Sequence, residues 1–331
     1  MERCAFMIFS PTPAKRISNR SRLLTPIAAI SGIALGGRPL PAFASEDNRR
    51  VVATTGQVGD LARIIGGDHT NVRALMGPGV DPHLFKASEG DVIDLIESDI
   101  IMYSGLHLEG GLGEVLEQAS KRIPVSEVSD GIPQDQLIQP EDDAFDGNPD
   151  PHFWFDPMLW AFAADETARA LTELDGDNAA AYLANTEAYK AELVKLDAYA
   201  MEQFSRIPVQ SRILVTAHDA FGYLGRRYGL DVVGLQGIST ATEAGVRDVQ
   251  SIADLLFANE VKAIFVETSV PERTIEAVQV ASRDRGWEVA IGGSLYSDAM
   301  GDEGTDEGTY LGMMRYDIDT IVAGLSGVKT E

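Results

Sequence analysis

The fold class is decided by residues 50–76, which read RVVATTGQVGDLARIIGGDHTNVRALM. A β-branched run over 51–55 is followed by a helical pattern over 58–65, which a glycine pair ends, and by a second apolar run over 71–76. Short apolar strands separated by a helix are typical of a parallel sheet with helical crossovers. The stretch therefore predicts an α/β fold.

The same alternation continues toward the carboxyl end. It predicts a helix over 88–96 and a strand over 99–103, and a second alternating region begins after residue 208. In that region the predicted strands cover 212–216, 231–235, 262–267 and 287–291, and the predicted helices cover 220–228, 246–258, 271–283 and 310–325. Two such regions predict two doubly wound lobes with parallel sheets.

A helical segment separates the two regions. Residues 130–151, rich in proline and acidic side chains, predict a loop, and Asp156-Pro157 then supplies an N-cap and a favoured first helical residue. Helical composition continues to about residue 207, interrupted only near 175–177. We therefore predict an N-terminal α/β lobe over 45–155, a connecting helical spine over 156–207, and a C-terminal α/β lobe over 208–331.

The first 44 residues predict a secretory signal peptide. A basic start reaches Arg22, an apolar segment covers 23–35, and Ala42-Phe43-Ala44 supplies small residues for cleavage. The alternative, a buried helix, is disfavoured by the glycines near its end. The remaining 287 residues suffice for two lobes. No later apolar run is long enough to span a bilayer, so we expect a protein that is not embedded in a membrane.

Net charge and cysteine content limit the classes of partner and ligand that the sequence supports. Without the leader the chain has 21 basic and 50 acidic side chains, a formal net charge of −29. Such a surface disfavours nucleic acid and attracts cations, although solubility alone would also explain it. The only cysteine, Cys4, lies in the leader, which leaves no disulfide and no thiolate ligand. Because no cysteine follows the apolar segment to accept a lipid, we expect a free periplasmic protein.

Five histidines are the candidates for chemistry, and two of them share a tripeptide. Asp-Pro-His occurs at 81–83 and again at 150–152. The proline fixes φ just before each histidine and so stiffens the backbone. The repeat predicts a shared role for His83 and His152.

Further candidates follow predicted strands. His83, His218 and Asp298 come after the strands ending at 76, 216 and 291, and open α/β sheets bind ligands beyond the carboxyl ends of their strands. His152 enters from the acidic loop. With two candidates in each lobe, we expect His83, His152, His218 and Asp298 to meet in the cleft between the lobes. Imidazoles with one carboxylate suit zinc, manganese or ferrous iron, whereas calcium and magnesium prefer oxygen ligands alone.

Three other residues are assigned less directly. His69 lies in a turn and is predicted to be a surface residue or a satisfied core residue, and His107 is predicted to support the site or the fold without being a ligand. Glu267, at a strand end, has three open interpretations. It competes with Asp298 as a ligand, accepts a hydrogen bond from a ligating imidazole, or faces solvent.

Several long motifs, in order, resemble one family: the solute-binding proteins of ABC importers for zinc, manganese and iron, often called TroA-like. The resemblance covers essentially the whole chain after the leader. The motifs lie at 80–85 (VDPHLF), 150–157 (DPHFWFDP), 216–223 (TAHDAFGY), 235–240 (LQGIST) and 292–314, which includes YSDAM at 296–300.

The resemblance implies that residues matching His83, His152, His218 and Asp298 hold a metal ion. A histidine at the third position looks like the zinc-or-manganese branch of the family. The family's connecting helix implies limited closure on binding. This chain lacks the histidine-rich loop of the zinc-specialised members and the lipid-acceptor cysteine of many relatives.

The sequence therefore predicts a periplasmic protein that captures Zn²⁺ or Mn²⁺ as a transported ligand and delivers it to an ABC permease. No phosphate-binding glycine loop is present, so the ATPase would be a separate subunit. The alternative is a secreted zinc-dependent hydrolase, which usually leaves one metal position to water and adds a general base. No His-Glu-x-x-His motif is present. A third interpretation is a surface adhesin, which would not depend on His83.

Overall fold

The computed structural model describes residues 48–140, 145 and 147–326. The predicted signal peptide, residues 1–44, lies outside the described residues, as do 141–144 and 146 of the acidic loop. In the part of the chain that is described, no helix is both long enough and apolar enough to cross a membrane.

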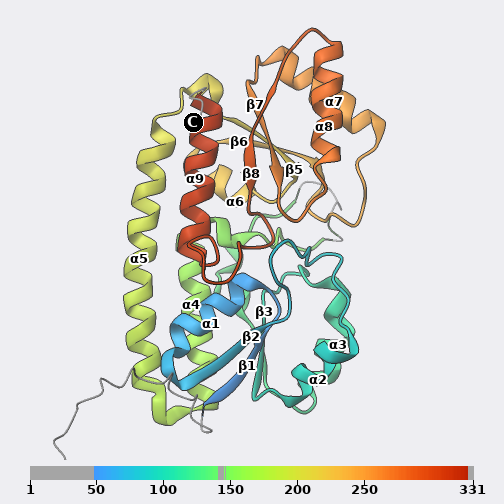
Figure 1. Cartoon of the computed structure of the whole chain (residues 1–331). Helices are drawn as coiled ribbons and strands as arrows, with labels where there is room; N and C mark the ends of the chain where they lie inside the picture. Colours follow the sequence, from blue (N-terminus) through green and yellow to red (C-terminus); the bar gives the residue numbers. More distant parts are fainter. Residues whose placement is uncertain (1–47, 141–144, 146, 327–331) are drawn as a thin grey trace, which may run out of the picture. The chain divides into compact units, whose positions relative to one another are not determined.

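The first lobe is a doubly wound sheet (Figure 1). Its four parallel strands lie in the order β2-β1-β3-β4. The elements are β1 (Arg49–Ala53), α1 (Gly56–Gly66), β2 (Thr70–Ala74), α2 (Glu89–Glu97), β3 (Ile100–Tyr103), α3 (Gly113–Ser120) and β4 (Val125–Glu127). Val51 and Ala53 pack in the same core as α1, whereas Val52 faces the opposite side with Leu95 of α2 and Leu116 of α3. Both faces are covered, as the near-continuous apolar strands predict.

The second lobe repeats this arrangement. Its elements are β5 (Ile213–His218), α6 (Gly222–Tyr228), β6 (Asp231–Gln236), α7 (Val246–Ala258), β7 (Ala263–Glu267), α8 (Arg273–Asp284), β8 (Ala290–Leu295) and α9 (Tyr310–Ser326). The strands form two parallel pairs, β5-β6 and β7-β8, and β5 lies against β7. The spatial order β6-β5-β7-β8 matches that of the first lobe, with α7 and α8 on one face and α9 on the other. The predicted two-lobed α/β fold is confirmed.

The helical spine is a hairpin of two helices, α4 (Pro157–Leu174) and α5 (Ala179–Ser205). Asp156 caps α4 as predicted, with its side chain accepting from the backbone of Met158. The chain reverses at the predicted interruption near 175–177, so that α4 and α5 lie side by side. The hydrogen bond from Trp160, near the start of α4, to Tyr189 of α5 shows this arrangement. The 27 residues of α5 extend about 40 Å, and α9 packs beside this helix (Figure 1).

Three elements differ from the sequence-based expectations. The patterns predict no element between 104 and 129, where the structure has the short α3 and the three-residue β4. The last strand begins and ends later than the predicted 287–291, because β8 continues through Gly292-Gly293. A Cβ at Gly292 would lie 2.7 Å from the ring of Phe265, so glycine here serves close packing between paired strands, although it resembles a strand end in the sequence.

Tyr310, the first residue of α9, joins the two lobes and the spine. Its ring stacks on Trp160 of α4 at 5.1 Å between centroids, and its hydroxyl donates to the carbonyl of Trp154 at 2.6 Å. Its backbone N–H donates to Asp60 of α1 at 2.9 Å. Asp60 thus satisfies one of the free donors at the N-terminus of α9 from a helix 250 residues earlier. These contacts fix the end of the loop that carries Asp298.

We expect Asp60→Ala to destabilise the protein by about 1–3 kcal/mol, because it leaves the buried N–H of Tyr310 without an acceptor. The free energy of urea unfolding measures this loss. Asp68→Ala, at an exposed acid in the turn after α1, is the matched control and should change stability by less than about 0.5 kcal/mol. Equal effects of the two substitutions would contradict the role of Asp60.

Candidate metal centre

Four side chains converge from distant parts of the chain: His83, His152, His218 and Asp298. One potential ligand atom from each lies within 4.8 Å of the others. The structure therefore brings together all four residues that the sequence analysis singled out.

The four residues come from four different segments. His83 lies in the loop between β2 and α2, and His152 immediately precedes the 3₁₀ turn Phe153–Phe155. His218 is the last residue of β5, and Asp298 follows β8. All four side chains are at most 2% exposed.

The Asp298 carboxylate is at the centre of the cluster. Its oxygens lie 3.2 Å from Nε2 of His152, 3.2 Å from Nε2 of His218 and 3.9 Å from Nε2 of His83. The Nε2 atoms of His83 and His152 are 3.4 Å apart. Within the described residues, three buried atoms of the cluster have no hydrogen-bond partner. They are the two carboxylate oxygens of Asp298 and Nε2 of His218. Buried polar atoms without partners are costly, so this geometry fits a cation that all of them would contact.

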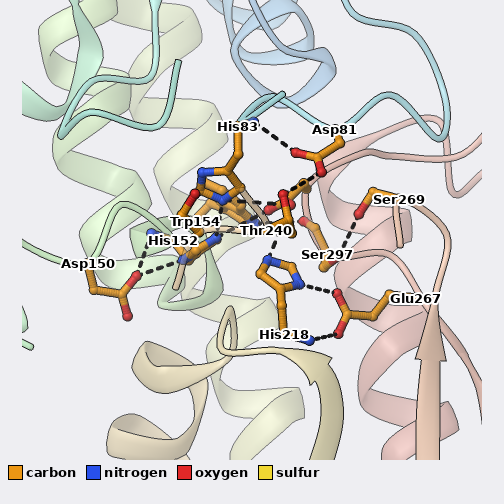
Figure 2. Close-up of polar contacts among 12 residues, drawn as sticks. Asp81, His83, Asp150, His152, Trp154, His218, Thr240, Glu267, Ser269 and Ser297 are labelled. Atoms are coloured by element: carbon orange, nitrogen blue, oxygen red, sulfur yellow. Dashed lines mark hydrogen bonds and ion pairs between the residues drawn. The ribbon is translucent and has the colours of Figure 1, made fainter. Parts of the chain in front are cut away.

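Two of the imidazoles are oriented by carboxylates on their far side (Figure 2). Asp150 lies 2.8 Å from Nδ1 of His152 and also accepts from its backbone N–H at 2.9 Å. Glu267 lies 2.5 Å from Nδ1 of His218 and accepts from its backbone N–H at 2.9 Å. Each carboxylate therefore turns Nε2 of its histidine toward Asp298. Of the three interpretations of Glu267, the structure supports the hydrogen-bond acceptor, because both of its oxygens face His218.

His83 is held differently. Its backbone N–H donates to Oδ1 of Asp81 at 2.8 Å, but Oδ2 of Asp81 accepts from the hydroxyl of Thr240 at 2.5 Å (Figure 2). Thr240 belongs to the loop between β6 and α7. The two Asp-Pro-His repeats thus share the bond from the histidine N–H to the aspartate two residues before it. They differ in the second contact of the carboxylate, which is the ring of His152 for Asp150 and the hydroxyl of Thr240 for Asp81.

The cluster is strongly coupled electrostatically. Burial lowers the pKa of His83 to about 3. Burial also disfavours the charged form of His152, but its hydrogen bond with Asp150 and the charges of Asp150 and Asp298 prevail and raise its pKa to about 9. The pKa of Asp298 is held well below its usual range despite burial, because the charges of the surrounding imidazoles, His218 first, favour the carboxylate. The site is therefore arranged to hold an ionised carboxylate next to a positive charge.

The remaining histidines lie outside the cluster. His69 is in the turn after α1, with its ring 6.0 Å from that of Tyr182. His107 is exposed, and its ring lies 5.8 Å from that of Phe145 between centroids, which in turn lies 6.4 Å from the ring of His83. Neither joins the four converging side chains.

Sequence reasoning did not identify several supporting residues. Asp81 and Asp150 carried a signal in the repeated tripeptide, where the acid precedes each histidine by two residues. Thr240 carried a signal only as the last residue of the motif at 235–240, and Gln57 carried none, although Gln57 donates to the carbonyl of Ser297, next to Asp298. Trp154 donates to the same carbonyl at 3.3 Å.

Comparison with known proteins gives a consistent result. Residues 51–324 match the family described as "ZnuA: Zinc-uptake complex component A periplasmic". The chain is 46% identical over 282 residues to the manganese-binding lipoprotein MntA of Bacillus subtilis, covering 85% of this chain and 91% of that protein. It is 44% identical over 283 residues to the zinc-binding protein TroA of Treponema pallidum, covering 86% and 91%. The solved structure of the periplasmic zinc-binding protein TroA from Treponema pallidum superposes with a TM-score of 0.82, covering 84% of this chain and 99% of that one.

We expect binding of a divalent metal to release protons, because imidazoles bind metal only in the neutral form. His152, with a pKa raised to about 9, carries a proton at neutral pH that the metal must displace, whereas His83 carries none. Apparent affinity should therefore rise as the pH rises toward about 9, the pKa of His152. Calorimetric titration with Zn²⁺ in buffers of different ionisation enthalpy measures the protons released. Binding without proton release at pH 7 would contradict this account.

Proposed function

The chain belongs to the ZnuA family, the periplasmic A components of zinc-uptake complexes, and on that premise we propose that it captures one Zn²⁺ or Mn²⁺ ion and delivers it to an ABC permease. The observation that carries the proposal is the buried cluster of three imidazoles and one carboxylate. The metal is the transported substrate in this function, and no chemical step on it is required.

We propose His83, His152, His218 and Asp298 as the metal ligands. The Nε2 atoms of the histidines and one oxygen of Asp298 supply four donors, the number that a closed tetrahedral zinc site uses. The second oxygen of Asp298 is also free of hydrogen bonds in the described structure, so a metal of higher coordination number would find a fifth donor. Asp150 and Glu267 hold His152 and His218 in orientation, as outer carboxylates of metal sites commonly do.

The hydrolase alternative is not supported. A catalytic zinc site keeps one position for water and needs access for substrate. Here four protein donors surround the centre and their side chains are at most 2% exposed. The family is one of binding proteins for transport, and we propose that this chain acts without catalysing a reaction.

We propose secretion through a signal peptide over residues 1–44 and residence in the periplasm. The relatives include proteins named as lipoproteins, but here the only cysteine, Cys4, precedes the apolar segment. A chain without a lipid acceptor would diffuse freely to its permease. We further propose a division into lobes at 45–155 and 208–331 with a spine at 156–207, because every strand of the first sheet precedes α4 and every strand of the second follows α5.

We expect the protein purified from its native compartment to contain close to one equivalent of zinc or manganese, measured by elemental analysis. The relatives are named for manganese in one case and zinc in another, so the sequence identity does not choose between them. In competition at equal free concentration, zinc should bind more tightly, as nitrogen-rich sites generally favour it. A protein that contains neither metal and takes up neither metal on titration would contradict the proposal.

We expect His152→Ala to weaken Zn²⁺ binding by more than about 100-fold, which exceeds the loss caused by removing an outer partner of a ligand. The dissociation constant, from chelator competition, measures this change, and circular dichroism checks that the fold persists. His69→Ala is the matched control, because His69 lies in a turn outside the cluster. Unchanged affinity in His152→Ala would remove this residue from the ligand set.

A further inference from the structure

The four proposed ligands are not held with equal firmness. A carboxylate binds both the ring and the backbone N–H of His152, and another does the same for His218. The loop before Asp298 is anchored at the carbonyl of Ser297, which accepts from Gln57 and Trp154. These contacts fix three of the four ligands to the body of the protein.

His83 lacks such an anchor on its ring. No carboxylate in the described part of the chain binds its second ring nitrogen, and its backbone is held only by the N–H bond to Asp81. It lies in the loop between β2 and α2, and the next residue, Leu84, is 55% exposed. His83 is thus the ligand nearest to solvent and the least constrained of the four.

The remaining support for His83 comes from the opposite lobe. Asp81 Oδ1 accepts from the His83 N–H, and Asp81 Oδ2 accepts from the hydroxyl of Thr240 at 2.5 Å. Thr240 is 159 residues farther along the chain and only 7% exposed. One carboxylate therefore positions a ligand of the first lobe and joins it to a loop of the second lobe (Figure 2). A hydrogen bond to a charged acceptor is among the stronger ones.

We propose that the Thr240–Asp81 hydrogen bond is a latch that keeps His83 on the metal and sets the rate at which the metal leaves. This inference rests on the proposed function. When the hydroxyl leaves the carboxylate, the two lobes lose a direct bond beside the site and the His83 loop is released from one of them. His83 then departs first, which opens a coordination position to water while His152, His218 and Asp298 stay in place. Thr240 is a positioning residue, since it acts on the metal only through Asp81.

The test is the dissociation rate of Zn²⁺ from the loaded full chain without its leader. Excess 4-(2-pyridylazo)resorcinol captures the released metal, and stopped-flow absorbance follows the reaction. Thr240→Val removes the hydroxyl and keeps the side-chain shape, so we expect dissociation to accelerate by about 10-fold or more. The association rate should change little, because the four ligands remain. Thr240→Ala serves the same comparison if the valine variant does not fold.

Two controls separate a latch from a general loss of stability. Thr240→Ser restores a hydroxyl and should return the dissociation rate to near the wild-type value. Thr274→Val removes a hydroxyl that bonds the carbonyl of Pro271 at the start of α8, away from the site, and should leave the rate unchanged. In an Asp81→Ala background, Thr240→Val should add nothing, because both changes remove the same bond.

Several results would overturn the latch. These are a wild-type dissociation rate in Thr240→Val, equal acceleration in Thr274→Val, or additive effects of Asp81→Ala and Thr240→Val. Failure of the proposed function itself looks different, because the wild-type chain would then bind no stoichiometric Zn²⁺ at the start of the experiment.

Discussion

The structure depends on one buried charge, the Asp298 carboxylate. It is fully buried, and neither of its oxygens has a hydrogen-bond partner in the described structure. Removing a carboxylate from water costs several kcal/mol unless opposite charge compensates it. Three imidazoles surround this group, and in the absence of metal the protons of His152 and His218, whose pKa values are raised by the neighbouring carboxylates, supply that compensation. A divalent cation would replace those protons, so the same arrangement of side chains compensates the carboxylate in the metal-free and in the metal-bound protein.

The fold provides the means to assemble this centre. Each lobe has its strands in the same order, and each presents ligands at the carboxyl edge of its sheet. His218 ends β5 directly, and His83 follows β2 by a loop. Trp160 of the spine and Tyr310 of α9 stack on each other and so join the spine to the second lobe. The hydrogen bond from Thr240 to Asp81 joins the lobes beside the site, together with those from Gln57 to Ser297 and from Tyr310 to Asp60.

The carboxylates behind the ligands explain the repeated tripeptide. In both Asp-Pro-His segments, the aspartate accepts the backbone N–H of the histidine two residues later. Glu267 supplies the same bond to His218 from a neighbouring strand. Three histidines therefore have three carboxylates, but only two of these also fix a ring. The ring of His83 therefore lacks the carboxylate contact that the rings of His152 and His218 have.

The sequence by itself determined the α/β class, the helical spine and the four converging residues. The strands are apolar and β-branched, the caps at Ser88 and Asp156 are local, and the Asp-Pro-His repeat is visible in the chain. Only the tertiary structure decided the role of Glu267, the reversal between α4 and α5, and the bond between Thr240 and Asp81. Those features depend on which distant residues come into contact, and local propensity and periodicity carry no information about contacts separated by 49 or 159 residues.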